Sequence, residues 1–176
     1  MQSVIEELQA HHAANFGWAL TCCAWQRDVA DEVLQDAYLR VLDGRARYSG
    51  HSTSKTWFFS VIKRVAADMQ RTLKRRSILN LRIVSSDAAL AGDKTPDTSE
   101  IVSDAWEADD SSRQLHVALM TLPTRQREVL HLLFYAELTL EDTAIALDVS
   151  VGSVRTHYHR GKKRLSVLLC LEENDD

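Results

Sequence analysis

Proline and glycine are scarce in this sequence, at two and six residues among 176. Because both residues interrupt regular secondary structure, their scarcity favours helices. Cysteine is scarce as well, and its three copies, Cys22, Cys23 and Cys170, form no even-numbered disulfide framework. Cys22 and Cys23 are adjacent in a segment that otherwise has the pattern of a buried helix face. The sequence therefore indicates a protein that works in a reducing compartment.

Long hydrophobic runs are missing too. No stretch approaches the roughly 18 consecutive apolar residues that a membrane span requires. Glu6 and Glu7 stand where a signal peptide would be basic. We therefore expect no membrane insertion and a cytoplasmic location.

Residues with catalytic or metal-binding spacing are also lacking. The side chains that could suggest such chemistry are three histidines and two cysteines, namely His11, His12, Cys22, Cys23 and His51. Neighbouring residues point to different sides of a helix, so neither adjacent pair can supply two ligands to one metal ion. The chain has no glycine-rich phosphate loop, and the acidic pairs at 109–110 and 141–142 fit a linker and a helix start. We therefore expect no catalytic residue, no metal, no cofactor and no enzymatic activity.

An overall excess of positive charge is absent, since the formal net charge is −4. The charges are unevenly distributed, however. Residues 1–82 carry 12 basic and 8 acidic side chains, residues 83–114 carry 2 and 8, and residues 115–176 carry 7 and 9. Residues 150–169 hold five basic side chains and no acidic one. A basic segment therefore lies within an acidic protein, and for nucleic-acid binding the distribution matters more than the sum.

Helical periodicity is clear in the first half of the chain and predicts helices over about 4–25, 28–41 and 55–76. The apolar stripe expected in the first helix is Leu8, His12, Phe16, Ala19 or Leu20, and Cys23. Asp28 is the expected cap of the second helix, and its buried stripe is Ala30, Val33 or Leu34, Ala37 and Val41. Trp57, Val61, Ile62, Val65 and Met69 recur at the same spacing in the third.

A composition change separates this half from the rest. Between about Ile83 and Ser112 the chain is rich in Ser, Thr, Asp, Gly and Pro and has little periodicity, which predicts a flexible acidic linker. Helical patterns resume near Arg113. We therefore predict an all-α protein with two small helical domains, over 1–82 and 113–176, joined by a linker over 83–112.

The end of the second domain has the layout of a helix-turn-helix. Thr139 and Asp142 approximate a capping box for one short helix, and Ser150 can cap the next. The inward positions of this last helix are Val154, Tyr158, Gly161, Leu165 and Leu168. Eight other residues of this segment form the outward face that a DNA groove would meet, where they can contact bases and phosphates. They are Gly152, Ser153, Arg155, Thr156, His159, Arg160, Lys162 and Lys163. A solvated basic face is the alternative, but two capped helices joined by a short turn are more specific to DNA binding.

Several segments carry a resemblance to bacterial RNA polymerase sigma factors. Leu122–Val129, Leu138–Asp142 and Val149–Arg155 resemble sigma region four, a pattern that some transcriptional activators share. Asp31–Val41 resembles the second helix of sigma region two, and Trp57–Asp68 resembles its promoter-melting helix. Because both regions occur in order and no further domain is present, the chain is identified as similar to the small extracytoplasmic-function (ECF) subfamily. The resemblance implies a factor that directs core polymerase to promoters for transcription initiation.

The resemblance also implies partners. In the family the second helix docks on the clamp helices of the polymerase beta-prime subunit, region four binds the beta flap, and many members are held by an anti-sigma factor. The residues that would bind core polymerase here form an exposed face of mixed charge, for which simple solvation is the alternative. They are Asp31, Glu32, Gln35, Asp36, Leu39 and Arg40.

Family members open the minus-ten promoter element as single strand, and the resemblance assigns that role to a loop and the third helix. The matching loop residues are Tyr48, Ser49, Gly50, His51 and Ser52. Those of the third helix are Lys55, Phe58, Lys63, Arg64 and Arg71. Aromatic rings can stack on unpaired bases and cations can hold the strands. Packing is the alternative role for Tyr48, and core burial is the expected one for Trp57.

Three positions depart from the family pattern. Arg64 replaces a common Asn, Thr143 a usual Ile, and Asp148 the Gly that usually ends the first helix of the helix-turn-helix. Arg64 puts in doubt which base is read there but favours phosphate binding. Asp tolerates the left-handed conformation less well than Gly, so we expect a weaker helix cap and the same fold. The rival class is a transcriptional activator whose first half binds a ligand or a partner other than polymerase.

Overall fold

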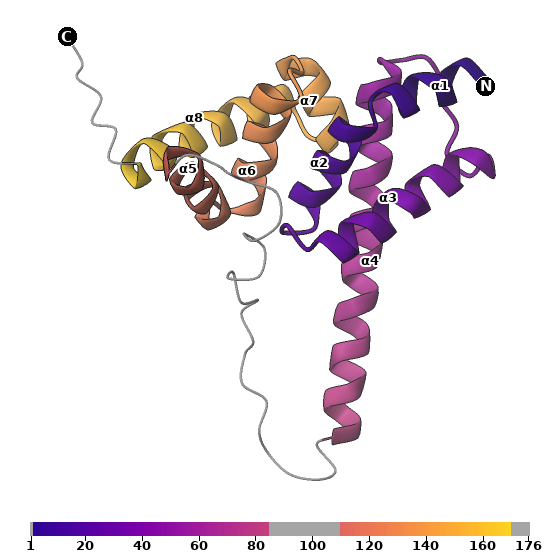
Figure 1. The fold of residues 1–176 in the computed structure, drawn as a ribbon, viewed down its shortest axis with the longest axis horizontal. Coiled ribbons are helices and arrows are strands. Elements are labelled where there is room, and N and C mark those ends of the chain that lie inside the picture. The colour runs from indigo at the N-terminus through magenta and orange to yellow at the C-terminus, as the bar shows by residue number, and fades with distance from the viewer. Residues whose placement is uncertain (1, 85–109, 170–176) are drawn as a thin grey trace.

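The computed structural model describes residues 2–84 and 110–169, and the side chains within 4–75 and 113–169. All regular elements in these stretches are helical (Figure 1). They are α1 (Gln2–Ala10), α2 (His12–Cys22), α3 (Arg27–Leu42), α4 (Ser54–Val84), α5 (Asp110–Thr121), α6 (Thr124–Leu130), the π-helical turn η2 (His131–Tyr135), α7 (Leu140–Leu147) and α8 (Val151–Leu168). Most of the predicted linker and Cys170 lie outside the described residues. None of the described helices is long and apolar enough to span a bilayer.

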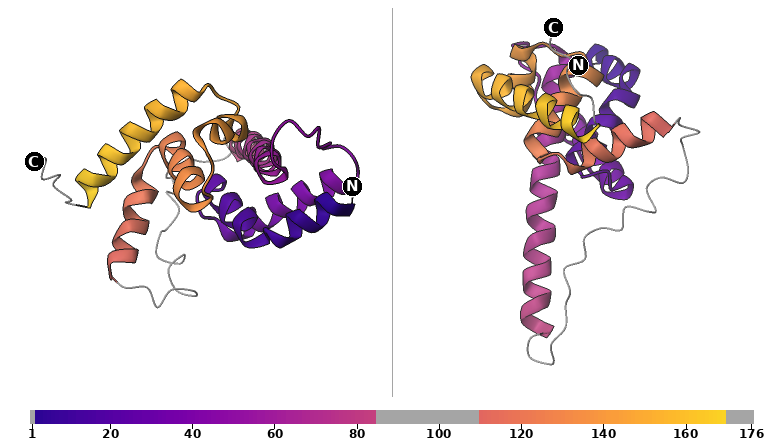
Figure 2. Two further views of the ribbon diagram at one scale, coloured as in Figure 1. Left: turned by 90° about the horizontal axis from the view of Figure 1, so that it is seen from above. Right: turned by 90° about the vertical axis from the view of Figure 1, so that its left-hand side faces the viewer.

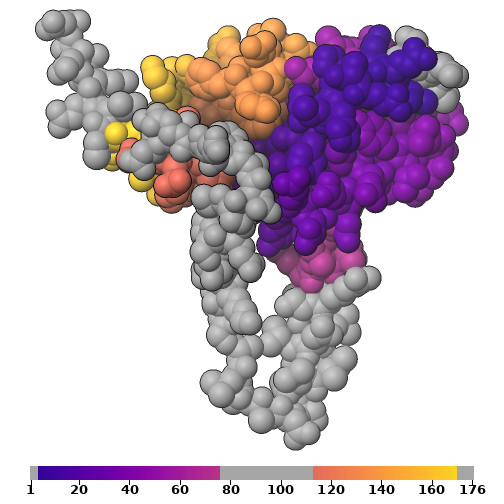
Figure 3. Space-filling view, in the orientation of Figure 1, coloured from indigo at the N-terminus to yellow at the C-terminus, as the bar shows by residue number. Residues whose placement is uncertain are grey.

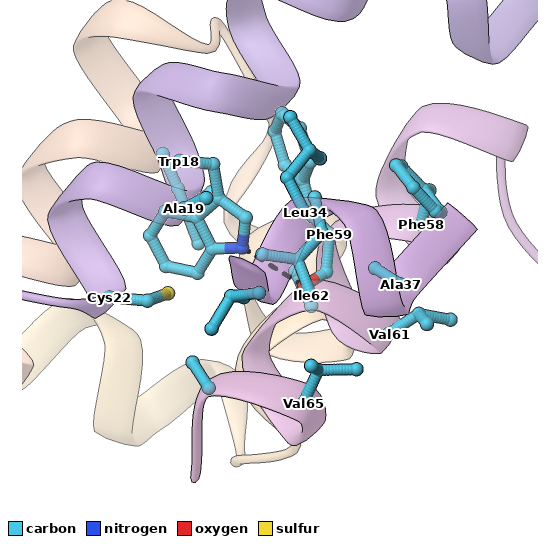
Figure 4. Close-up of a cluster of buried hydrophobic side chains, with 14 of the residues drawn as sticks. Trp18, Ala19, Cys22, Leu34, Ala37, Phe58, Phe59, Val61, Ile62 and Val65 are labelled. Carbon is cyan, nitrogen blue, oxygen red and sulfur yellow. Dashed lines mark hydrogen bonds between the residues drawn. The ribbon is translucent and has the colours of Figure 1, made fainter. Parts of the chain in front are cut away.

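The first domain packs α2 and α3 against α4. Trp18 is fully buried, and its indole Nε1 donates a hydrogen bond of 2.9 Å to the carbonyl of Phe59 on α4 (Figure 4). Ile62 is also fully buried in this cluster. Burial of each large apolar side chain stabilises the fold by roughly 1.5–3 kcal/mol, so this cluster fixes α4 on the bundle.

The first predicted helix is wrong as a single element, because the chain breaks at His11 (φ −100°, ψ 18°) into α1 and α2. The break changes the phase of the buried stripe. His12, predicted to be inward, is exposed, whereas Asn15 is buried. Asn15 donates its amide to the carbonyl of Leu8 (2.8 Å) and to the Tyr38 hydroxyl (3.1 Å), so this polar core position is tied to α3.

The second predicted helix is confirmed as α3, and its buried stripe is the predicted one, with both Val33 and Leu34 inward. The predicted cap is wrong by two residues. Gln26 occupies the cap position, and Asp28 lies inside the first turn, where its charge favours the helix dipole.

The third helix is longer than predicted. α4 begins at Ser54, where the Thr53 hydroxyl accepts a hydrogen bond of 3.1 Å from the backbone N–H of Thr56. It continues past the predicted end at Arg76 to Val84 and projects well beyond the bundle (Figure 1). Basic residues favour a helix C-terminus but do not stop a helix, which explains the error.

The helix-turn-helix is confirmed as α7 and α8. The hydroxyls of Thr139 and Ser150 accept hydrogen bonds from the N–H groups of Asp142 (3.0 Å) and Ser153 (3.1 Å). Asp148 adopts the left-handed conformation (φ 54°, ψ 53°) that a glycine would adopt without strain. One predicted inward residue of α8 is wrong, since Leu168 is 42% exposed beyond the last packed turn.

The two helical domains touch each other. α7 packs along α4, while α6 and η2 contact α2. Figure 2 shows α6 and α7 beside the top of α4, and in Figure 3 the orange C-terminal atoms meet the indigo N-terminal atoms. This contact between the two domains determines which of the candidate DNA-binding residues are accessible.

Candidate nucleic-acid and polymerase interfaces

Close packing of α8 on α6 orients the candidate recognition helix. Val154 and Gly161 are buried on the inner side of α8. A Cβ atom at Gly161 would lie 3.1 Å from Leu130 and 3.3 Å from Gln126, so only glycine fits this crossing without displacement. The opposite side of α8 is thereby turned to solvent.

The structure brings the predicted groove-reading residues onto this outward side. Seven of the eight are exposed and Ser153 is half-buried. None of their basic groups forms an ion pair within the described residues. The Thr156 hydroxyl donates to the carbonyl of Gly152 at 2.9 Å, which leaves its methyl group free to face outward. At Gly152 nothing but the Ser150 hydroxyl comes within 4 Å of an added Cβ, so this end of the helix is open to a close approach.

The loop before α4 is compact and partly self-bonded. Tyr48 is 37% exposed, its ring lies 5.3 Å from that of Trp57, and its hydroxyl donates to the carbonyl of Ser52. His51 and Ser49 share a hydrogen bond of 2.7 Å, and Gly50 adopts a positive φ of 78°. Tyr48 thus packs against Trp57 and remains partly exposed.

The predicted strand-holding residues of α4 divide into three groups. Arg64 and Arg71 are exposed, and Arg71 lies 3.2 Å from Asp68. Lys55 and Lys63 are instead half-buried against the second domain. The prediction that Phe58 contacts DNA is wrong for this conformation, because its side chain is fully buried with its ring 4.9 Å from that of Tyr38.

The predicted polymerase-binding residues lie together on α3. Asp31, Glu32, Gln35 and Leu39 are exposed, and Leu39 is 51% exposed. Asp36 and Arg40 pair at 2.9 Å.

Two features of this surface were missed from the sequence. Arg40 also reaches Asp68 on α4 at 3.1 Å, and Leu42 is 58% exposed next to Leu39. Leu42 lies outside the predicted buried stripe, which ends at Val41, and three residues after the exposed Leu39, so the helical spacing could have indicated its exposure.

Polar contacts between the domains were also missed from the sequence. Lys63 Nζ donates to Glu128 Oε1, whose side chain is fully buried, and Lys55 Nζ donates to the carbonyl of Ala136 at 2.7 Å. The Thr56 hydroxyl donates to Asp142 Oδ1 at 3.2 Å. No spacing rule could reveal these pairs, because their members are more than 60 residues apart.

His131 lies at the centre of this contact. Its Nδ1 is 3.0 Å from the Thr21 hydroxyl, which in turn donates to the carbonyl of Gly17 at 3.0 Å. Since that single hydroxyl proton is used, Nδ1 must carry the hydrogen and Nε2 is left buried without a donor. Burial lowers the pKa of His131 to about 4, so the imidazole is neutral at physiological pH.

The adjacent cysteines are both buried and free. Burial raises the pKa of Cys23 to about 11 and that of Cys22 well above its ordinary value. Both thiols are therefore protonated at neutral pH and pack as small apolar side chains.

Two protein-family models match this chain, one over each helical domain. The Sigma-70 region 2 model matches residues 9–76, and the Sigma-70, region 4 model matches residues 112–165. An all-helical region 2 and a region 4 helix-turn-helix in one chain define a sigma factor, a non-catalytic initiation factor that binds core RNA polymerase and promoter DNA.

Curated relatives indicate which kind of sigma factor this chain resembles. The ECF RNA polymerase sigma factor SigX of Bacillus subtilis is 28% identical over 79% of this chain and 70% of its own length. RNA polymerase sigma factor CarQ of Myxococcus xanthus is 25% identical over 96% of this chain and 90% of its own. The chain belongs to the ECF family of RNA polymerase sigma factors and directs promoter recognition in transcription initiation.

Solved structures share the fold. Sigma factor RpoE from Bartonella quintana, in complex with the anti-sigma factor NepR, superposes with a TM-score of 0.66 at 17% identity, covering 98% of this chain and all of that one. CnrH in complex with the cytosolic domain of CnrY gives 0.60 at 20% identity, covering 98% and 90%.

Proposed function

We propose that this sigma factor divides promoter recognition between its two domains. The outward side of α8 reads the minus-thirty-five element, the loop at 48–52 with the exposed side of α4 holds the minus-ten strand, and the exposed face of α3 binds core polymerase. The minus-ten role and the polymerase-binding role belong to a domain over 1–82, and the minus-thirty-five role belongs to a domain over 113–176. The observation that carries this proposal is the cationic outward side of α8, which no ion pair within the described residues neutralises.

The support for the minus-thirty-five role is steric and electrostatic. A helix whose outer side carries Arg155, His159 and Lys162 fits a major groove, where an arginine can form a bidentate contact with guanine. Lys163 and Arg160 are exposed on the same helix and are suited to phosphates. The N-terminal end of α8 is the end that the groove would meet first.

A matched pair of arginines tests this role. At 100° per residue, Arg164 lies about 180° around α8 from Arg155, and both are exposed. We expect Arg155→Ala to lower transcription from a minus-thirty-five-dependent promoter about tenfold, since one good base contact contributes roughly 1–3 kcal/mol. Core polymerase binding should be unchanged, and Arg164→Ala should lower transcription less than twofold. Reconstituted transcription and competition binding to core polymerase measure both effects, and equal losses in the two variants would overturn the assignment.

The minus-ten role rests on two kinds of exposed group that bind an unpaired strand, an aromatic ring for the bases and cations for the phosphates. Tyr48 offers a partly exposed aromatic ring, and Arg64 and Arg71 offer cations on the same domain. Base stacking and phosphate pairing together hold single strands with little sequence preference.

Further partners follow from the family. The exposed aromatic rings of Phe134 (65%) and Tyr135 (66%) offer an apolar surface for the beta flap of polymerase. Because two related folds were solved with an anti-sigma factor or the cytosolic domain of a second protein, an anti-sigma protein is the proposed regulator here. Because core polymerase is the partner, the cytoplasm is the proposed location.

A further inference from the structure

We propose that α4 carries a phosphate-binding track that continues past its minus-ten residues and holds the backbone of the duplex between the two promoter elements. The track consists of Arg64, Arg71 and Arg75. The inference rests on the proposed minus-ten role of α4, and it adds Arg75 and a second stretch of DNA to that role. Its support is the spacing of the three arginines, their exposure and the projection of α4 from the bundle.

The three arginines lie on one side of α4. At 100° per residue, positions 71 and 75 lie within about 20° of position 64 around the helix axis. At 1.5 Å per residue the track is about 17 Å long. The sequence continues the spacing, because Arg82 follows Arg75 by seven residues and α4 extends to Val84. A line of arginines on one side of a helix suits a DNA backbone, whose phosphates a planar guanidinium can bind bidentately.

The guanidinium groups of the track are available to an anion. All three are exposed, and Arg64 and Arg75 form no ion pair within the described residues. Arg71 lies 3.2 Å from Asp68, but the two side chains are 69% and 49% exposed, and an exposed pair contributes little. Residues 69–86 hold five basic side chains and no acidic one. No acidic neighbour along this stretch of the chain therefore offsets the charge of the track.

α4 leaves the bundle before the track ends. Val65 and Ala66 are buried, whereas every residue from Gln70 to Arg75 is exposed, although these six positions go more than once around the helix. Figure 1 shows the projecting end of α4. A helix end that is surrounded by solvent gains no stability from packing, so contact with an external partner would stabilise it. The charge of the track fits an anionic partner, and promoter DNA is the polyanion that a sigma factor binds.

The length of α4 places the far end of the track beyond the minus-ten strand. Along the helix axis, Arg64 lies about 15 Å from Ser54 and Arg75 lies about 32 Å from it. A strand that is held by the loop at 48–52 and by Arg64 follows the first half of this distance, which leaves Arg75 for the adjoining duplex. The chain continues from α4 to the second domain, which we assign to the minus-thirty-five element. We therefore place Arg71 and Arg75 on the duplex between the two elements.

The test uses holoenzyme that is reconstituted from the full chain and core polymerase and bound to a duplex promoter. One promoter carries uncharged methylphosphonate linkages directly upstream of the minus-ten element, and another carries them directly downstream. The double variant combines Arg71→Ala with Arg75→Ala. Arg76→Ala is the matched control, because it removes the same charge at a position about 100° or more around α4 from each position of the track.

On unmodified DNA, the loss of two phosphate contacts should flatten the slope of log affinity against log salt concentration by about 1.8. Raising the salt from about 50 to about 200 mM should therefore weaken wild-type binding roughly tenfold more than it weakens binding of the double variant. The upstream neutral linkages should weaken binding of the wild type and of Arg76→Ala and should leave that of the double variant unchanged. Competition for core polymerase should be the same for all three proteins.

Weaker competition for core polymerase by the double variant would assign the track to polymerase and overturn the inference. An equal change of slope in Arg76→Ala, or upstream linkages that weaken the wild type and the double variant equally, would overturn it as well. Coupling of the double variant to the downstream linkages alone would contradict the placement between the elements. Failure of the proposed minus-ten role would appear elsewhere, as a missing cross-link from position 48 to the minus-ten strand, and would leave the neutral-linkage result intact.

Discussion

Thr143 buries a hydroxyl group that has no hydrogen-bond partner among the described residues. The family usually has isoleucine at this position, and the structure explains why an apolar residue suits it, since the side chain is fully buried on α7. An unsatisfied buried hydroxyl costs roughly 1–3 kcal/mol relative to a paired one. The chain therefore carries a local defect inside its helix-turn-helix.

Replacing this hydroxyl by a methyl group should stabilise the protein. We expect Thr143→Val to raise the free energy of unfolding by about 1 kcal/mol, measured by urea denaturation. The same change four residues earlier, Thr139→Val, removes the cap of α7 and should lower stability by roughly 1 kcal/mol. Destabilisation by both changes would show that the Thr143 hydroxyl is satisfied.

His131 should make stability depend on pH. Its folded-state pKa of about 4 is below the ordinary value of 6.5. The contribution of the neutral ring to the free energy of unfolding is therefore fully present above pH 6.5, and it is lost as the pH falls through 4. The groups that face the ring are Thr21 and Trp18 of α2 and Tyr135 of its own helix.

Between pH 7 and pH 5 the free energy of unfolding should fall by roughly 2 kcal/mol, because His131 takes up a proton in the unfolded chain and stays neutral when it is buried. Urea denaturation at each pH measures it. His131→Gln is the control, and an equally steep loss in that variant would assign the pH dependence to other groups.

At the scale of the element, the helices with caps or a full apolar stripe were predictable. α3 follows from its stripe, and α7 and α8 follow from Thr139 and Ser150, whose hydroxyls cap them. The break at His11 was not predictable, because it results from tertiary packing of Asn15 against Tyr38 and not from a breaker residue. The length of α4 was missed since nothing in the sequence stops it at Arg76.

The exposed face of α3 gives a prediction at this scale. Leu39→Asp places a charge in the surface that we assign to polymerase, beside the exposed Leu42. We expect at least about tenfold weaker competition for core polymerase, since charge is disfavoured at the apolar centre of an interface. Duplex DNA binding by the free chain should be unchanged. Val117→Asp, an equally exposed apolar position on α5, is the control, and a similar loss there would contradict the assignment.

At the scale of the whole molecule, the order of the two domains and their division of basic charge were predictable from the sequence. Their contact was not, because Lys63 and Glu128 each read as an ordinary charged residue on its own helix. The contact between the domains changes the meaning of the predicted site, since Lys55 and Lys63 of α4 are bonded to groups of the second domain.

Photo-cross-linking in the assembled polymerase–promoter complex tests the two-domain account most directly. With benzoylphenylalanine at position 48 or at position 159, both exposed, the account predicts cross-links to the non-template strand at the minus-ten element and to the duplex at the minus-thirty-five element, respectively. The two sites should lie about 25 base pairs apart. Cross-links from both positions to one promoter element, or none from position 48, would contradict it.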